Sequence, residues 1–298
     1  MIIQAYAKIN LAINVLNKKE DGYHEIDMVA IPLEMHDSLE IFEVPNNNQS
    51  YITSDDPNLV CDESNLAFKA LALFSKHYEM KRSYRIHIYK RIPTEAGLGG
   101  GSADAAAIIR VLCKLQKIDP LSPEIIKLAR QLGSDVPLCL YNKPCHVQGT
   151  GEILSDIELA KSFYVLVVKP NKGLSTKAVF QELDRVREEN NQPIEQTTLL
   201  PLIDELQTSK PLEIDHIFNS LLQPAINLCP EINEVLNELS TNKFKYYGMS
   251  GSGSACYALH EDKKYLEEVA KKLRNKDYDV FVTSFLNHKQ FLKKHKIK

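Results

Sequence analysis

The sequence predicts a protein of mixed α and β structure that is divided into about two domains. Its 298 residues are enough for two domains that each bury a core. Segments whose apolar residues alternate, which is typical of strands, are interspersed with segments rich in helix-forming residues. The turn-forming run 148–152, which reads QGTGE, places the predicted boundary near the middle of the chain.

The first predicted strand carries a lysine and an amide on its weakly polar face. Apolar side chains recur at alternate positions between residues 5 and 15, so Lys8 and Asn10 fall together on the opposite face. On its own, Lys8 reads as a solvated lysine of a strand, and a functional lysine is the alternative.

A turn, two further strands and a helix follow the first strand. The sequence DGYH at 21–24 predicts a turn, from which Tyr23 and His24 project on a loop. The segment 26–44 reads as two strands. A helix is predicted over 66–74, where apolar residues and alanines dominate.

A glycine-rich stretch, PTEAGLGGGSAD at 93–104, joins a strand to a helix. Residues 83–92 alternate in the manner of a half-buried strand, and 105–112 lack glycine and proline. Glycine lets the backbone approach a ligand, and a helix start offers unpaired N–H groups with a partial positive charge. The stretch therefore predicts a phosphate-binding site. A tight turn or linker is the alternative, although a linker would not carry Leu98 and continue directly into a helix.

The residue pattern of this stretch excludes two well-known kinds of phosphate-binding loop. The chain has no Gly-x-x-x-x-Gly-Lys-Ser, so it is not a P-loop. Ser102 stands where the dinucleotide fingerprint requires its last glycine.

An aspartate follows the next predicted helix. Ser122-Pro123-Glu124 has the order of a helix start, and the helix ends near Gly133. Asp135 then lies between this helix and an apolar segment, 138–141, that reads as a strand. A functional carboxylate and a turn-stabilising one fit this position equally well.

The second half repeats the mixture of strands and helices. A continuously apolar strand is predicted at 164–168, a helix begins near 175, and 199–240 reads as several helices. The run SGSGS at 250–254 lies between two strands, which favours a simple hairpin. A last helix over 265–274 and a strand over 280–285 complete this half.

Composition bounds the class of protein. The net charge of −3 gives no reason to expect nucleic-acid binding. The six cysteines are scattered and include no Cys-x-x-Cys pair, so we expect neither zinc nor a disulfide framework. With neither a signal peptide nor an apolar run of membrane-spanning length, the sequence predicts a cytoplasmic protein without a membrane partner.

Together these motifs resemble a known family. The sequence PTEAGLGGGS at 93–102 resembles the central motif of the GHMP kinases, a superfamily of small-molecule kinases with their own phosphate loop. Four more motifs match one branch of it in order: AKINL at 7–11, DGYH at 21–24, LGSDVP at 132–137 and MSGSGS at 249–254. That branch phosphorylates 4-diphosphocytidyl-2-C-methyl-D-erythritol in the non-mevalonate isoprenoid pathway. The resemblance runs from residue 5 to about 286.

The resemblance implies a role for each matching residue. Asp135 would be the catalytic base, with Lys8 as its partner. The pocket for cytidine and methylerythritol would contain Asn10, Tyr23, His24, Thr176 and Phe180, with Tyr23 or Phe180 stacked on the cytosine. The ATP phosphates would be wrapped by Pro93, Thr94, Glu95, Ala96, Gly97, Leu98, Gly99, Gly100, Gly101, Ser102 and Ala103, with Asn65, Leu66 and Lys90 towards adenine and ribose. A second loop facing the phosphates would comprise Ser250, Gly251, Ser252 and Gly253.

The implied fold is the two-domain α+β fold of the GHMP kinases. Residues 1–152 would form a nucleotide-binding domain of the ribosomal protein S5 domain 2-like type, and 153–298 a ferredoxin-like domain that closes the substrate cleft. The implied cofactors are ATP and Mg²⁺, with Ser102 as the protein ligand of the metal. A monomer or weak homodimer is expected. Glu95 departs from the family pattern, because small residues are common there: it faces solvent or, turned inwards, would weaken ATP binding unless a metal ion or lysine offset it.

Two other functions are compatible with the motifs. One is a GHMP kinase for another small alcohol, such as homoserine or mevalonate, although the aromatic residues Tyr23 and Phe180 suit a planar base better. The other is a non-catalytic nucleotide-binding module, which would be free to lose Lys8 and Asp135.

Overall fold

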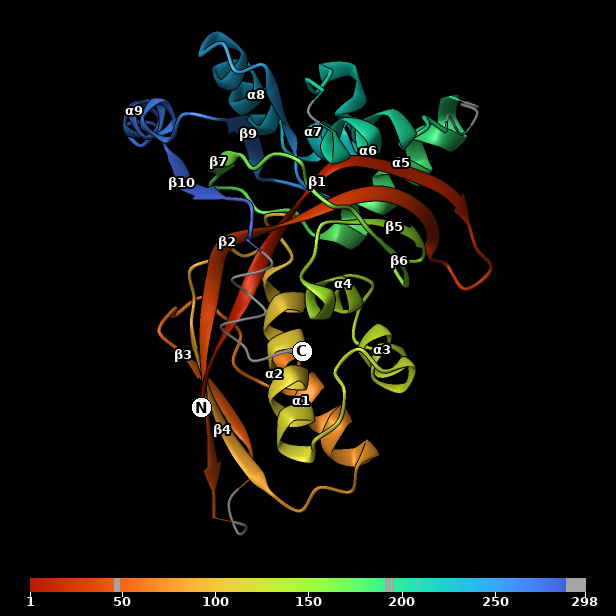
Figure 1. Ribbon diagram of the computed structural model, residues 1–298, viewed down its shortest axis with the longest axis vertical. Coiled ribbons are helices and arrows are strands. Elements are labelled where there is room, and N and C mark those ends of the chain that lie inside the picture. The colour runs from red at the N-terminus through yellow and green to blue at the C-terminus, as the bar shows by residue number, and fades with distance from the viewer. Residues whose placement is uncertain (46–48, 191–193, 195, 209, 288–298) are drawn as a thin grey trace. The chain divides into compact units, whose positions relative to one another are not determined.

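The chain forms two compact units, each assembled from separate stretches (Figure 1). This computed structural model describes residues 1–45, 49–190, 194, 196–208 and 210–287. Among them, the first unit combines Met1–Ala7, Met35–Thr94 and Gly99–Asn142. The second combines Lys8–Glu34, Glu95–Leu98 and the chain from Lys143 onwards. The division into domains 1–152 and 153–298 stays a prediction.

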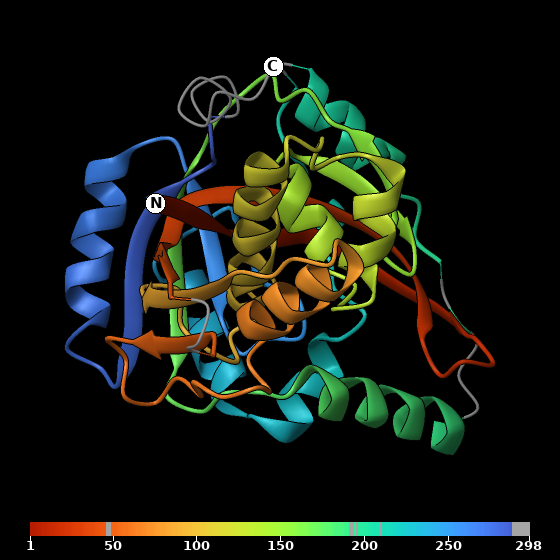
Figure 2. The ribbon, with the colours of Figure 1, turned by 90° about the horizontal axis from the view of Figure 1, so that it is seen from below.

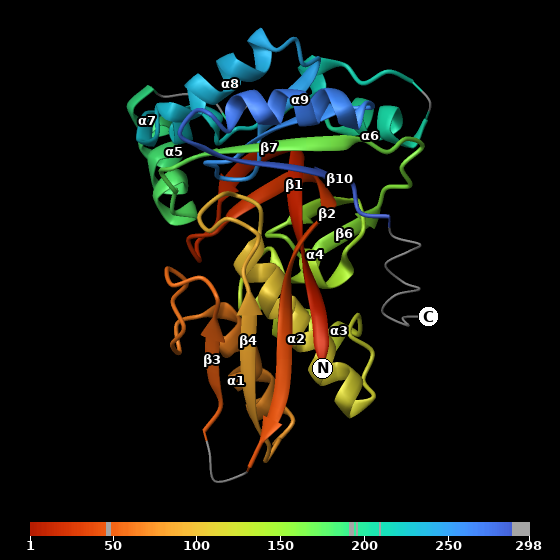
Figure 3. The ribbon, with the colours of Figure 1, turned by 90° about the vertical axis from the view of Figure 1, so that its left-hand side faces the viewer.

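The sheet of the first unit contains β3 (Tyr51–Ser54), β4 (Ser83–Tyr89) and the C-terminal part of β2 (His24–Val44) (Figure 3). Strand β4 is antiparallel to β2, with Ser38 opposite Tyr89, and β3 is parallel to β4. The prediction of two strands over 26–44 was wrong, since β2 is one strand. It continues through Asp37 because this buried carboxylate has partners, the backbone N–H groups of Arg91 and Ile92 among them.

Four helices complete the described part of the first unit. They are α1 (Leu66–His77), α2 (Gly100–Gln116), α3 (Pro123–Arg130) and α4 (Val136–Tyr141), and α2 packs against both α1 and α4 (Figure 2). Asn65 is the N-cap of α1, where its side chain accepts a hydrogen bond from the Ala67 N–H at 2.9 Å. Buried aliphatic and aromatic side chains such as Ile86, Phe74 and Ile108 form the core between sheet and helices.

Helix α4 corrects the predicted strand at 138–141. A short apolar run cannot be assigned from periodicity alone, because a fully buried helix has the same composition as a buried strand. Pro137 stands in the first turn of α4, where proline is tolerated in a helix, and the segment Val136–Leu140 is buried.

The second unit contains an antiparallel sheet in the order β10-β7-β9-β8. Its strands are β7 (Tyr164–Pro170), β8 (Tyr246–Met249), β9 (Cys256–His260) and β10 (Tyr278–Ser284). Helices α8 (Glu231–Thr241) and α9 (Lys263–Leu273) pack on this sheet, α8 before β8 and α9 between β9 and β10. The order of elements and strands is that of a ferredoxin-like domain.

The remaining elements of the second unit position the residues discussed below. The part of β1 (Ile2–Lys18) from Lys8 onwards belongs here, and the first part of β2 pairs with β5 (Cys145–Gly149), which pairs with β6 (Ile153–Asp156). The helices are α5 (Thr176–Asn190), α6 (Leu200–Gln207), α7 (Leu222–Leu228) and the short 3₁₀ helix Ile214–His216. No helix in the described part of the chain is both long and apolar enough to cross a membrane.

Arg110 provides a test of packing in the first unit. Its buried guanidinium donates to the carbonyl groups of Cys139 at 2.8 Å and Gln4 at 2.9 Å, and burial lowers its pKa to about 10. We expect Arg110→Met to lower the free energy of unfolding by about 3 kcal/mol, because the carbonyl groups of Cys139 and Gln4 lose a charged donor. Arg82→Met, which removes an exposed ion pair with Glu43, should cost less than about 1 kcal/mol in the same urea titration. Equal effects would contradict this account.

Candidate active site

The glycine-rich stretch forms the predicted corner between a strand and a helix. Strand β4 ends at Tyr89, and α2 begins at Gly100 with Gly99 as its N-cap. Gly99 has a φ of 71°, in the left-handed region that favours glycine. The first N–H groups of α2 lack helical acceptors, so this end of the helix can bind an anion.

The preceding residues, 95–98, belong to the second unit and are bonded to its backbone. The Glu95 carbonyl accepts from Leu174 N–H at 3.1 Å and Ser254 N–H at 3.4 Å, and the Ala96 carbonyl accepts from Ala255 N–H at 3.2 Å. Glu95 is exposed, and its side chain lies over Gly173, where an added Cβ would come within 2.5 Å of the carboxylate. Its backbone, with φ 52°, is held in the left-handed region by these contacts.

Gly97 lies directly against the second loop of small residues, 250–254. Its carbonyl accepts hydrogen bonds from Lys8 Nζ and from Ser250 Oγ, both at 3.0 Å. A Cβ at Gly97 would lie 2.0 Å from the Ser250 carbonyl oxygen, and its φ of 70° is left-handed. Only glycine fits there without displacing the backbone of the other loop.

Lys8 is buried, with 5% of its surface exposed, and is not the solvated lysine that its strand position suggests on its own. Its ammonium also donates to Asn10 Oδ1 at 2.7 Å, and Asn10 Nδ2 contacts Met28 Sδ at 3.1 Å. An added Cβ at Gly251 would lie 3.2 Å from Lys8 Nζ. The structure thus brings the ammonium, the amide and both glycine loops together within the second unit.

The loop 250–254 is a buried connection between β8 and β9, despite its polar composition. Asn219 Nδ2 donates to the carbonyl groups of Met249 at 3.0 Å and Gly251 at 2.8 Å. Ser252 Oγ is 2.9 Å from Thr176 Oγ1, at the start of α5. Asn219 was not among the predicted site residues, because its isolated position in the sequence gives no sign of this contact.

His24 and Phe180 lie side by side, as a shared pocket requires. Their ring centroids are 5.2 Å apart with an interplanar angle of 41°. His24 is the first residue of β2 and is buried, so it does not project from a loop as predicted. Tyr23, by contrast, is 61% exposed. Asp184 on α5 contacts His24, at 2.7 Å between Oδ1 and Nε2, and was not among the predicted site residues.

Lys90 is held by two buried carboxylates in the first unit. Its ammonium contacts Asp37 Oδ2 at 2.5 Å and Asp104 Oδ2 at 3.0 Å. A Cβ at Gly100 would lie 3.0 Å from the same nitrogen, so the ammonium packs directly under the start of α2. An acid at 104 within an alanine-rich helix was the available sign that this helix contacts a cation.

The cluster of Lys90, Asp37 and Asp104 contains one ammonium group and two carboxyl groups, so its formal charges do not cancel. Burial raises the pKa of Asp104 to about 7, against the attraction of Lys90. Burial lowers the pKa of Lys90, but attraction to Asp104 and Asp37 outweighs it and leaves that pKa raised. Asp104 Oδ1 is buried and has no hydrogen-bond partner among the described residues, which is consistent with a carboxyl group that takes up a proton readily.

The other predicted site residues of the first unit lie at element ends. Asp135 is the N-cap of α4 and is partly exposed, Asn65 and Leu66 start α1, and Pro93 and Thr94 precede Glu95. Ser102 and Ala103 lie near the start of α2. At the neighbouring Gly101, an added Cβ would lie 3.5 Å from Leu66 Cδ1. Asp135 and Lys8 belong to different units.

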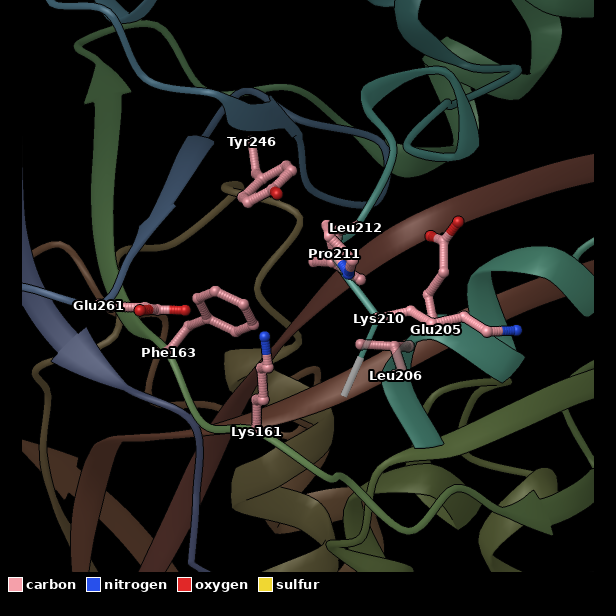
Figure 4. A pocket seen from close by; sticks show the side chains of 9 residues that line it. All are labelled: Lys161, Phe163, Glu205, Leu206, Lys210, Pro211, Leu212, Tyr246 and Glu261. Carbon is pink, nitrogen blue, oxygen red and sulfur yellow. The ribbon is translucent and has the colours of Figure 1, made fainter. Parts of the chain in front are cut away.

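A pocket of about 140 Å³ lies elsewhere in the second unit (Figure 4). It is lined by Lys161, Phe163, Glu205, Leu206, Lys210, Pro211, Leu212, Tyr246 and Glu261. None of these is a predicted site residue, and both signs of charge line it.

The folds and motifs of both units are those of one family. The chain belongs to the GHMP kinases: residues 65–143 match the GHMP kinases N terminal domain and residues 200–279 the GHMP kinases C terminal domain. It is therefore a kinase, as the glycine-rich corner indicates.

Relatives with assigned names define the branch. Proteins named 4-diphosphocytidyl-2-C-methyl-D-erythritol kinase from Clostridium kluyveri and Caldicellulosiruptor bescii are 33% and 32% identical to this chain. The alignment with the Clostridium kluyveri protein covers 95% of this chain and 99% of that protein. The alignment with the Caldicellulosiruptor bescii protein covers 92% of this chain and 94% of that protein. A crystal structure of 4-(cytidine 5'-diphospho)-2C-methyl-D-erythritol kinase, 31% identical, matches with a TM-score of 0.77 over 95% of this chain and 98% of that one. A mevalonate kinase structure, at 15% identity and a TM-score of 0.69 over 96% and 99%, shares the fold.

The role of Gly97 can be tested by stability. We expect Gly97→Ala to lower the free energy of unfolding by at least about 2 kcal/mol, because alanine combines left-handed strain with a backbone clash. Gly101→Ala is the matched control: its Cβ would meet only Leu66 at 3.5 Å, and alanine favours a helix by up to about 1 kcal/mol. Urea denaturation measures both, and a Gly97→Ala protein as stable as Gly101→Ala would contradict the assigned contact.

Asp104 should make stability depend on pH. Its folded pKa of about 7 lies above its ordinary value of 3.8, so between these values the folded protein keeps a proton that the unfolded chain releases. The contribution of Asp104 to stability therefore falls as pH rises through this window. As the pH rises through this window, we expect the free energy of unfolding of Asp104→Asn to increase relative to that of the unsubstituted protein, by up to about 1.4 kcal/mol per pH unit. Urea denaturation at a series of pH values measures this difference. A difference that does not change with pH would show that the titrating group lies elsewhere.

Proposed function

We propose that this kinase transfers the γ-phosphoryl group of ATP to the 2-hydroxyl of 4-diphosphocytidyl-2-C-methyl-D-erythritol. The observation that carries the proposal is the buried Lys8 ammonium, held between Asn10 and the Gly97 carbonyl beside both glycine loops. The names of relatives that match almost the whole chain support the choice of substrate. We further propose a cytoplasmic protein that is a monomer or weak homodimer, with 1–152 carrying the nucleotide and 153–298 closing on the substrate.

In this proposal, residues 93–103 bind the phosphates of ATP. The N–H groups at the start of α2 supply donors and a partial positive charge. Asn65 and Leu66 lie towards adenine and ribose. Two N–H groups of the Lys90 ammonium serve Asp37 and Asp104, which leaves one for the nucleotide among the described contacts.

Asp135 and Lys8 are the proposed catalytic residues. A sugar-alcohol hydroxyl is a poor nucleophile at neutral pH, so a carboxylate that accepts its proton assists the attack on the γ-phosphorus. The ammonium of Lys8 would stabilise negative charge on the attacking oxygen. Because the two residues belong to different units, their pairing rests on the family motifs.

The substrate side of the proposal uses residues of the second unit. The pocket for the cytidine and methylerythritol groups would be formed by Asn10, Tyr23, His24, Thr176 and Phe180. The rings of His24 and Phe180, 5.2 Å apart, offer the aromatic surface that a planar base requires. The loop from Ser250 to Gly253 would face the phosphates.

Mg²⁺ fits the site as an ion that arrives with the nucleotide. No group of three or more His, Cys, Asp or Glu side chains that could hold a metal occurs in the described parts of the chain. Mg²⁺ commonly keeps several waters and binds phosphate oxygens, so one protein oxygen suffices. Ser102, in the first turn of α2, is the proposed ligand. When bound, the ion would neutralise charge on the phosphates.

A panel of alcohols tests the proposed substrate. With ATP and Mg²⁺, ADP release should occur with 4-diphosphocytidyl-2-C-methyl-D-erythritol and not with mevalonate or homoserine. Turnover of either small alcohol at a comparable rate would identify a different GHMP kinase. ATP binding without turnover of any alcohol would indicate a nucleotide-binding module.

Substitution of the proposed base should separate catalysis from binding. We expect Asp135→Asn to lower kcat on the order of 10²- to 10⁴-fold, the usual contribution of a general base, with the Kd for ATP largely unchanged. Lys8→Met should lower kcat on the order of 10²- to 10³-fold, because a donor to the transition state is lost. Asp277→Asn, at an exposed position in the second unit, is the control and should retain full activity. An unaffected rate in Asp135→Asn would exclude that residue as the base.

A further inference from the structure

We propose that Asp184 is a positioning residue that fixes the tautomer of His24, so that the free ring nitrogen accepts a hydrogen bond from the amino group of cytosine. The proposal rests on the proposed function, because it assumes that His24 faces a pyrimidine base. It assigns the preference for cytosine over uracil to a contact between α5 and the start of β2.

The contact is a shared carboxylate. Asp184 Oδ1 is 2.7 Å from His24 Nε2, and Asp184 Oδ2 is 2.7 Å from Lys18 Nζ. The side chain of His24 is 5% exposed and that of Asp184 is 19% exposed, whereas Lys18 is 54% exposed. The imidazole is thus the buried partner, and Lys18 covers the outer oxygen.

The position of the proton follows from the chemistry of the carboxylate. Burial raises the pKa of Asp184, but the hydrogen bonds from Lys18 and His24 outweigh burial and leave that pKa lowered. An ionised carboxylate can only accept hydrogen bonds, so Nε2 of His24 must carry a hydrogen. In the neutral ring, Nδ1 then has a lone pair and can only accept.

The ring is also held in orientation. Phe180 lies one helical turn before Asp184 on α5, so the carboxylate and the aromatic ring contact His24 from the same face of the helix. Arg187 ties α5 to β1 through the carbonyl groups of Val15 at 2.6 Å and Leu16 at 3.2 Å. Helix α5 and the strands on either side of the 19–23 turn therefore form one supported structure around the ring.

This tautomer distinguishes the two pyrimidines. Cytosine carries an amino donor where uracil carries a carbonyl acceptor. An Nδ1 lone pair pairs with the amino group but opposes the carbonyl oxygen, which leaves two buried acceptors unpaired. A mismatch of this kind weakens binding on the order of 10- to 100-fold.

Asp184→Asn is the direct test, with Lys18→Met as the matched control. Asparagine has the same shape, but its amide can donate as well as accept, so it no longer excludes the other tautomer. The unsubstituted protein should bind CDP on the order of 10- to 100-fold more tightly than UDP. We expect Asp184→Asn to reduce this ratio about tenfold without changing the Kd for ATP, and Lys18→Met to preserve it.

Nitrogen-15 NMR of the histidine rings gives a second readout that needs no substituted protein. The neutral form of His24 should show a protonated Nε2 and an unprotonated Nδ1. A ring protonated on Nδ1, or a ratio of CDP to UDP affinity that is the same in Asp184→Asn, would overturn the proposal. Failure of the proposed function would show differently, as absence of turnover of the diphosphocytidyl substrate by the unsubstituted protein.

Discussion

The close approach of Gly97 to Ser250 is the constraint on which the functional part of the second unit depends. The two loops come so near that no side chain fits at Gly97, and its carbonyl receives both the Ser250 hydroxyl and the Lys8 ammonium. A flexible loop could not hold a lysine in a buried position, since a buried ammonium must be hydrogen-bonded to offset its desolvation. Glycine at 97 therefore serves the geometry of Lys8, in addition to its proposed role in phosphate binding.

The same principle explains the other charged groups near the predicted site. Lys90 is buried beneath the start of α2, where Asp37 and Asp104 surround it, and His24 is buried with its ring in contact with Asp184. Each group is fixed by partners from distant parts of the sequence, so each is preorganised before a ligand binds. Such preorganisation suits phosphoryl transfer, in which positioning and charge stabilisation do most of the catalytic work.

The sequence was most informative where a local rule determines the structure. The glycine-rich corner, the helix that begins after Asn65 and the strand-loop-strand around 250–254 follow from turn and helix-start chemistry, and the structure confirms them. It was least informative where tertiary contacts decide. Helix α4 has the composition of a buried strand, and His24 was placed on a loop because its contacts with Asp184 and Phe180 are 160 and 156 residues away in sequence. Family motifs predicted a functional role for Lys8, which stays a prediction, whereas its position in the alternating pattern of β1 predicted none.

The central claim is that these glycine loops and Lys8 direct the phosphoryl group of ATP to one hydroxyl of a cytidine-linked alcohol. Phosphorus-31 NMR of the reaction products tests it most directly, because it identifies the new bond itself. The account predicts one new phosphate monoester, coupled to the carbon that bears the 2-hydroxyl, formed in equal amount with ADP. A monoester at another position of the methylerythritol group, or ADP accompanied only by inorganic phosphate, would contradict it.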